Sequence, residues 1–221
     1  MTTLIMHKRH AVYALNLFFS LSLAISTFFF TPFLVGRGVP ENVIGILYSI
    51  AFLCGGLGLV ASSATVARIG AVQAFVCAVA LSVGAFLLLP LAKSAVLAAA
   101  LFILISALTD FLMFVLDIFV EKTVSKEGTT GGVRGTFITM ANLAWVIAPL
   151  AAGGIIAIGG FDRLFTITAL LLLPLILISV VSLTTLAPHR GKVHVLHFRS
   201  FVKRLRRDDD LRHIFFAQFM L

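Results

Sequence analysis

The sequence has little charge and very little cysteine. Only 12% of its 221 residues are Asp, Glu, Lys or Arg, whereas 60% are hydrophobic. Soluble domains carry about 25% charged residues, so this composition excludes an ordinary soluble domain. The two cysteines, Cys54 and Cys77, both lie within apolar runs, where cysteine behaves as a small apolar residue. Their placement predicts core positions, and neither a disulfide nor a metal role.

Signatures of catalysis are also missing. The sequence has no Gly-x-Ser-x-Gly elbow and no His-Glu-x-x-His pair, which mark hydrolases and zinc proteases. The Gly-rich segment 128–132 lacks the Lys-Ser/Thr pair of a phosphate-binding loop. An intramembrane aspartyl protease needs acids on two helices, whereas Asp110 and Asp117 fall on one predicted helix. We therefore expect no enzyme activity, no cofactor and no bound metal.

Long apolar runs are what the sequence has in abundance. A helix crosses a hydrocarbon core of about 30 Å with roughly 17–25 apolar residues. Six runs reach this length, and a seventh begins near Ile214 and is cut off at Leu221. They predict an all-α, polytopic membrane protein with a six-helix transmembrane bundle. The six runs are residues 11–35, 43–65, 71–91, 95–120, 136–158 and 164–186.

The runs divide the chain into three predicted parts. Residues 1–187 form the six-helix bundle. Residues 188–213 are polar and basic and form a cytoplasmic linker, in which residues 197–207 place apolar side chains on one side and cations elsewhere. That pattern is typical of an amphipathic helix on an anionic lipid surface. Residues 214–221 are the truncated start of a seventh helix.

Basic residues predict the orientation in the membrane. Of the 17 Lys and Arg residues, only Arg37, Lys93 and Arg163 follow the first, third and fifth runs. The other 14 lie in the N-terminus and in the segments after the even runs. The positive-inside rule therefore predicts a cytoplasmic N-terminus, in the cytoplasmic (inner) membrane. The net charge of +8 is explained by this topology and by an anionic inner leaflet, so the lipid bilayer is the expected partner. No nucleic-acid recognition module is present in the sequence, and nucleic acid is not an expected partner.

Two acids within the fourth run predict a functional face. Asp110 and Asp117 are seven residues apart and share one side of a helix. Asp110 falls roughly mid-span, where a carboxylate costs about 2.5–3.5 kcal/mol and persists mainly beside a wet cavity. We expect Asp110 to bind a cation, a proton or a cationic group of a substrate. The alternative is a structural carboxyl paired with a neighbouring helix, and it weighs more for Asp117, beside Lys122 or Arg134.

Polar residues on two other runs are further candidates for a pathway. On the first run, Asn16, Ser20 and Thr27 lie within about 60° of one another around the helix. The alternative is that these groups hydrogen-bond within their own helix or to a neighbouring helix.

On the fifth run, Asn142 and Trp145 fall on one side together with Pro149 and Gly153. Trp145 either contacts a substrate or fills the bundle. Pro149 is a candidate for a helix kink, and Gly153 with Gly154 favours a close helix contact.

The loop after the second run carries a degenerate family motif. In residues 63–72, Arg68 and Gly70 match a G-x-L-x-D-R-x-G-R-[KR] signature, while Ala67 replaces its Asp. Residues 31–58 and the segment Ala148–Gly154 are similar to other elements of the same proteins. With its topology and loop lengths, the chain resembles the N-terminal half of a major facilitator superfamily (MFS) transporter.

The resemblance implies a secondary carrier that moves a small molecule or ion by alternating access between two six-helix bundles. It also implies a partner, which is either the missing C-terminal half or a second half-transporter chain. The alternative function is a non-transporting six-helix membrane scaffold, or an inactive fragment of a transporter.

Overall fold

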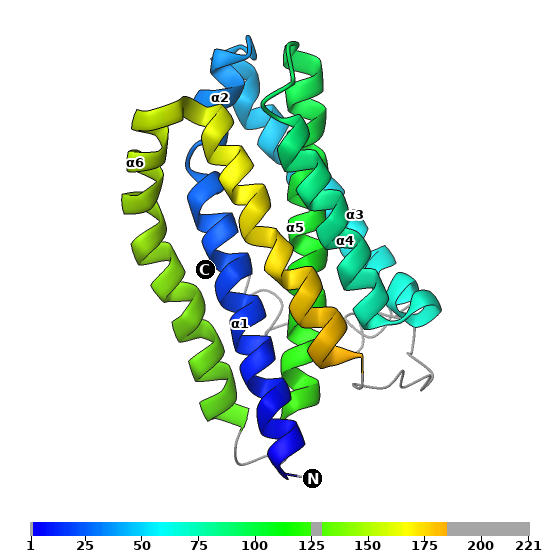
Figure 1. The fold of residues 1–221 in the computed structure, drawn as a ribbon. Helices are drawn as coiled ribbons and strands as arrows, with labels where there is room; N and C mark the ends of the chain where they lie inside the picture. The colour runs from blue at the N-terminus through cyan, green and yellow to red at the C-terminus, as the bar shows by residue number, and fades with distance from the viewer. Residues whose placement is uncertain (1, 125–129, 185–221) are drawn as a thin grey trace, which may run out of the picture.

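The computed structural model describes residues 2–124 and 130–184, which form a bundle of helices without a strand (Figure 1). This confirms the predicted all-α membrane bundle. The predicted linker 188–213 and seventh helix 214–221 lie outside the described residues. The elements are α1 (Thr2–Thr27), α2 (Phe30–Gly36), α3 (Glu41–Ile69), α4 (Ala71–Leu88), α5 (Ala95–Thr123), α6 (Thr130–Ile178) and a short π-helical segment, η2 (Ser179–Leu183).

Helix α6 contains both the fifth and the sixth predicted spans. Its backbone leaves helical values at Gly160, where φ is 66° and ψ is −164°. Only glycine adopts such angles readily. The chain turns back there, so a first arm (residues 130–159) and a second arm (residues 161–178) run side by side with the rest of the bundle (Figure 1). Among the described residues, five helical stretches are long and apolar enough to cross a membrane, and the fifth contains both arms of α6.

The first predicted span is not one helix, as residues 11–35 suggested. It breaks after Thr27, and α2 begins at Phe30. The break has a local cause in Pro32, which has no N–H group to bond the carbonyl of Phe28 and whose ring would clash with that carbonyl in a continuous helix. Pro32 instead occupies the first turn of α2, where no helical bond is lost.

Helix α1 lies at the centre and packs mainly on α6 (Figure 1). Three of its side chains donate hydrogen bonds to backbone carbonyls of α6. The Tyr13 hydroxyl reaches the carbonyl of Val133 at 3.4 Å, Asn16 Nδ2 reaches that of Phe137 at 2.6 Å, and Ser22 Oγ reaches that of Thr168 at 3.3 Å. Because lipid cannot supply donors or acceptors, polar bonds of this kind are a main source of helix association in a membrane.

Helix α3 is the least covered of the long helices. It packs on α5 and, at its C-terminal end, meets α4 through the turn at Gly70. Much of its apolar surface is exposed, including Phe52 and Leu57. On α4, Cys77 is exposed as well, so its prediction as a core residue is wrong. Both cysteines are free thiols.

Candidate functional site

A cavity of about 230 Å³ lies inside the half of the bundle that is remote from the N-terminus. Helices α1, α3 and α5 supply most of its wall, and α2, α4 and the second arm of α6 supply the rest. Its polar wall residues are Ser22, Ser26, Thr27, Tyr48, Ser82, Ser106, Thr109 and Asp110. The cavity is only partly enclosed by the described residues.

Asp110 is the one charged residue that lines the cavity. Its carboxylate makes no hydrogen bond and no ion pair with any residue that the structure describes. The side chain points across the α3–α5 contact to Gly55, which is buried. A Cβ atom at Gly55 would collide with Asp110 Oδ2. Glycine at position 55 therefore provides the room that the carboxylate occupies.

Five of the seven hydroxyl groups in the cavity wall donate hydrogen bonds to backbone carbonyls, and within the described residues those of Tyr48 and Thr109 do not. Thr27 Oγ1 donates to the carbonyl of Leu23 at 2.7 Å, and Ser106 Oγ donates to that of Phe102 at 2.9 Å. Ser22, Ser26 and Ser82 likewise donate to backbone carbonyls. Bonding of this kind leaves the lone pairs of the hydroxyl oxygens as acceptors but removes their protons as donors to a ligand.

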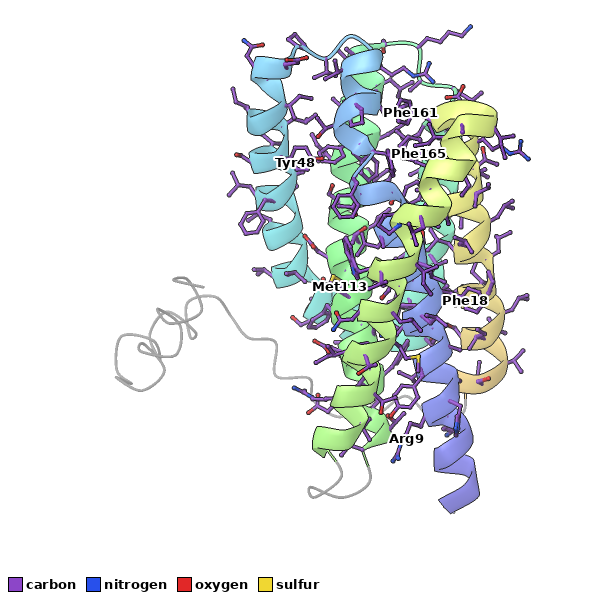
Figure 2. All side chains as sticks on the ribbon, turned by 90° about the vertical axis from the view of Figure 1, so that its left-hand side faces the viewer. Arg9, Phe18, Tyr48, Met113, Phe161 and Phe165 are labelled. Carbon is purple, nitrogen blue, oxygen red and sulfur yellow. The ribbon has the colours of Figure 1, made fainter. Side chains whose placement is uncertain are left out.

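Aromatic rings form much of the remaining wall. Tyr48, labelled on α3 in Figure 2, places its ring 4.8 Å from that of Phe102 on α5. The ring of Phe30 lies 5.1 Å from the same Phe102 ring. Phe19, Phe52 and Phe86 complete the set. The cavity thus combines a single carboxylate with apolar and aromatic surfaces.

The other predicted pathway residues on α1 do not all reach this cavity. Thr27 lines it. Asn16 and Ser20 are buried, and Asn16 instead bonds the first arm of α6 and accepts a hydrogen bond from Ser20 Oγ at 3.5 Å. Asn16 thus bonds a neighbouring helix and Ser20 bonds within its own helix, which are the two arrangements that the alternative interpretation names.

Most of the remaining candidates lie on the outside of the described bundle. Asp117 and Asn142 are exposed, and Asp117 forms no ion pair within residues 2–124 and 130–184. Trp145 is half-buried and packs edge-on against the ring of Phe28, with 5.6 Å between centroids. Arg68 is exposed beside the turn at Gly70, where φ is 90°.

The predicted features of the fifth span are placed differently from expectation. The helical backbone angles continue through Pro149, and the departure from them in α6 is at Gly160. Gly153 and Gly154 are exposed, and nothing described lies within 4 Å of a Cβ atom built on either. Neither glycine makes a close contact with another helix within the described bundle. Their smooth surface faces outward.

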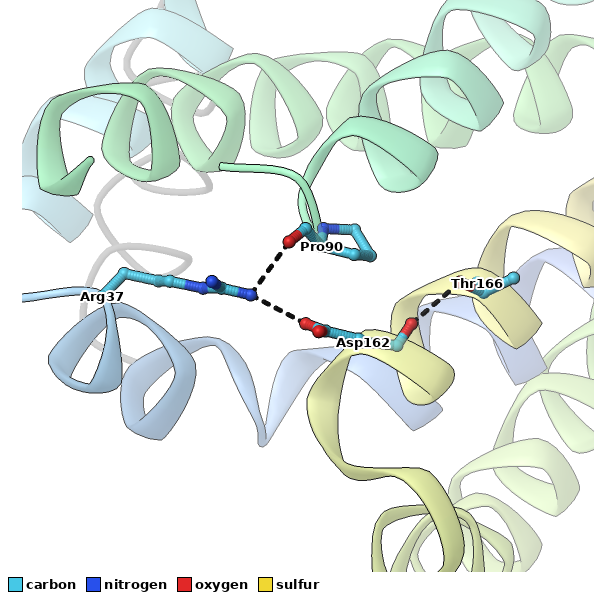
Figure 3. A network of polar contacts seen from close by, with 4 residues as sticks. All are labelled: Arg37, Pro90, Asp162 and Thr166. Atoms are coloured by element: carbon cyan, nitrogen blue, oxygen red, sulfur yellow. Dashed lines mark hydrogen bonds and ion pairs between the residues drawn. The ribbon is translucent and has the colours of Figure 1, made fainter. Parts of the chain in front are cut away.

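A second polar cluster lies among the turns at the end of the bundle remote from the N-terminus (Figure 1). Its contacts are drawn in Figure 3, and sequence reasoning did not identify it. Arg37 Nη2 donates to Asp162 Oδ1 at 2.7 Å and to the carbonyl of Pro90 at 3.0 Å. The guanidinium also stacks on the ring of Phe33, 5.0 Å from its centroid. One arginine thus joins three inter-helix turns. The available signal was the opposite charge of Arg37 and Asp162 in two turns predicted on the same side.

Comparison with known families adds evidence independent of this geometry. The sequence pattern of the Major Facilitator Superfamily matches residues 12–221. The chain belongs to this superfamily. No curated protein matches the chain.

Membership of the MFS confirms the predicted resemblance and accounts for the arrangement of the helices. MFS proteins are membrane transporters and not enzymes, so the chain is an integral membrane protein of a transporter family. In an MFS protein, a cavity lined by an unpaired carboxylate is a candidate for the transport pathway. Asp110, rather than the exposed Asp117, is the acid that meets this description.

Proposed function

We propose that this MFS chain forms one half of a secondary carrier, and that the cavity beside Asp110 is part of the path of a small solute. The observation that supports this most is the carboxylate of Asp110, which lines a mid-span cavity without a partner among the described residues. Because such a charge is costly in a membrane protein, its presence favours a role in binding a solute or a coupling proton.

The second half of the carrier is a proposed partner. The first arm of α6 presents Val146 and Leu150 with 69% and 81% of their surfaces exposed, and α3 presents Phe52 with 78% exposed. These helices flank α1 and α5 in the bundle. A second six-helix half placed against them would enclose the open side of the cavity, and rocking of the two halves would expose it to either side of the membrane.

The orientation is proposed from the charges. The N-terminus and the segments after the second, fourth and sixth runs carry 14 of the 17 Lys and Arg residues, so the N-terminus faces the cytoplasm of a cell whose inner membrane holds the protein. The cluster of Arg37 and Asp162 then lies on the outer side.

Access to the cavity from both sides tests the proposal. The test variant carries Cys54→Ala, Cys77→Ala and Ser106→Cys, so that its single cysteine lies at position 106. Membrane vesicles are prepared from cells that produce this variant. We expect membrane-impermeant maleimide to label this cysteine in right-side-out and in inside-out vesicles. Leu104→Cys on the same helix is the control, because Leu104 does not line the cavity. Labelling from one side only would favour a non-transporting scaffold.

A further inference from the structure

The chemistry of the cavity wall carries an inference about the solute. We propose that the cavity binds a small organic cation whose charged head sits at Asp110 and whose apolar or aromatic body packs on the surrounding rings. This inference rests on the proposed function, in which the same cavity is part of the transport path. It goes further because it selects one chemical class of solute.

Charge is the first selective feature. Among the described residues, the wall contains the carboxylate of Asp110 and no Lys, Arg or His. Arg37 lies at the same end of the bundle, but its guanidinium already donates hydrogen bonds to Asp162 and to the carbonyl of Pro90. An anionic solute would meet an acid and no counter-charge, whereas a cation would supply the partner that Asp110 lacks.

Hydrogen bonding is the second selective feature. Sugars and other polyols need many donors and acceptors from a binding site, because each hydroxyl that loses water without replacement weakens binding. Five hydroxyl groups of the wall already donate their protons to backbone carbonyls. The wall therefore favours a solute with few hydrogen-bonding groups over a polyol, to which it offers few donors.

The aromatic rings are the third feature. Six aromatic side chains line the cavity, with Tyr48 and Phe102 in contact across the α3–α5 boundary. Ring faces attract organic cations, and quaternary ammonium groups are the best-known case. The volume of about 230 Å³ is below the usual range of about 300–1,000 Å³ for drug-sized ligands. It fits a single ring that carries a compact ammonium head.

Gly55 helps to place the acid for this role. Since a Cβ atom at position 55 would overlap the carboxylate, the side chain of Asp110 lies between α3 and α5, the two helices whose Tyr48 and Phe102 rings are also in contact. Asp110 follows Phe102 by eight residues on α5, so the charge and this pair of rings lie along the same α3–α5 boundary, about 12 Å apart along the helix axis.

Protection of the cysteine at position 106 tests the inference. Phenyltrimethylammonium is the probe, benzenesulfonate carries the same ring with the opposite charge, and glucose represents polyols. We expect the probe to slow maleimide labelling at least tenfold at saturation, and the other two compounds to have no effect. Asp110→Asn should raise the concentration of the probe that halves the labelling rate at least tenfold. Asp110→Glu keeps the charge and should retain protection, which would show that a variant at this position still folds its site.

The outcomes separate this inference from the proposed function. If the cysteine is labelled from both sides but glucose or benzenesulfonate protects better than the probe, the carrier proposal stands and the organic-cation inference is wrong. Absence of protection by the probe, or equal protection in the Asp110→Asn variant, also overturns the inference alone. If the cysteine is not labelled from either side, the carrier proposal fails and the inference fails with it.

Discussion

Two acids in this molecule have opposite surroundings. Asp162 is 61% exposed at the end of the bundle, yet it has a direct ion pair with Arg37 at 2.7 Å. Asp110 lies in a cavity within the bundle and has no partner among the residues described. If stability alone decided the pairing, Asp110 would have the ion pair and the exposed Asp162 would not. An unpaired charge costs more free energy where water is scarce. The comparison shows that Asp162 joins two turns through Arg37, whereas Asp110 has no partner among the described residues, as the proposed solute site requires.

The strongest test of this contrast gives Asp110 an internal partner like that of Asp162. Ser106 precedes Asp110 by four residues on α5, so its side chain is a neighbour on the same face. We expect Ser106→Lys to weaken binding of labelled phenyltrimethylammonium by about 100-fold or more, which corresponds to about 2.8 kcal/mol. Ser106→Met adds similar length without charge and should cost less than tenfold. Equal losses in both variants would show that bulk, and not charge, controls the cavity.

The next test removes the space that the carboxylate occupies. Gly55→Ala should weaken binding of the same cation by about tenfold, or about 1.4 kcal/mol, because the new methyl group forces the carboxylate out of its place beside α3. Gly56→Ala is a matched control, since nothing described lies within 4 Å of a Cβ atom there. Equilibrium binding to the purified chain measures both. A loss as large in the control would contradict the role of Gly55.

Neutralising the unpaired acid should change stability in an unusual direction. Asp110→Asn keeps the shape of the side chain and removes a charge that lacks a partner. We expect the thermal unfolding temperature in detergent to rise by about 2–4 °C, the shift that about 1 kcal/mol produces in a chain of this size. A clear fall would mean that Asp110 has a structural partner, which is the alternative interpretation.

The same change at the paired acid should have the smallest effect and the opposite sign. Asp162→Asn removes an ion pair at an exposed position, and such pairs contribute at most about 1 kcal/mol. Arg37 keeps its bond to the carbonyl of Pro90 and its contact with the ring of Phe33. We expect a slightly lower unfolding temperature, and a difference that shrinks in about 1 M salt, where the screening length is about 3 Å. A salt-independent loss would point to a packing role for Asp162.

The prediction from sequence was most successful where local chemistry decides the outcome. Apolar runs of sufficient length must form helices in a membrane, because no other arrangement of one segment satisfies its backbone there. Glycine at position 70 marked a turn that the structure contains. Pro32 and Gly160 were also readable as breaks. The first helix ends at Thr27, ahead of Pro32, because a proline removes a helical hydrogen bond and clashes with the turn before it.

The candidate site was only partly predictable. Asn16, Ser20 and Thr27 share one side of α1, yet Asn16 bonds α6 while Thr27 lines the cavity. Helical periodicity states which residues share a face, and it does not state which neighbour that face meets at each height. For the same reason the sequence separated Asp110 from Asp117 only by its depth along the helix, and it did not state that Asp110 lines a cavity while Asp117 is exposed.

The sequence by itself determined that the chain crosses a membrane as a helical bundle, and that Asp110 is an acid in the middle of an apolar helix. These follow from hydrophobicity and from spacing along one helix, which are local properties. Only the tertiary structure decided that Asp110 faces a cavity without a partner, that Gly55 makes room for it, and that Arg37 joins Asp162 and Pro90. Each of these depends on contacts between segments far apart in the chain, which packing alone brings together.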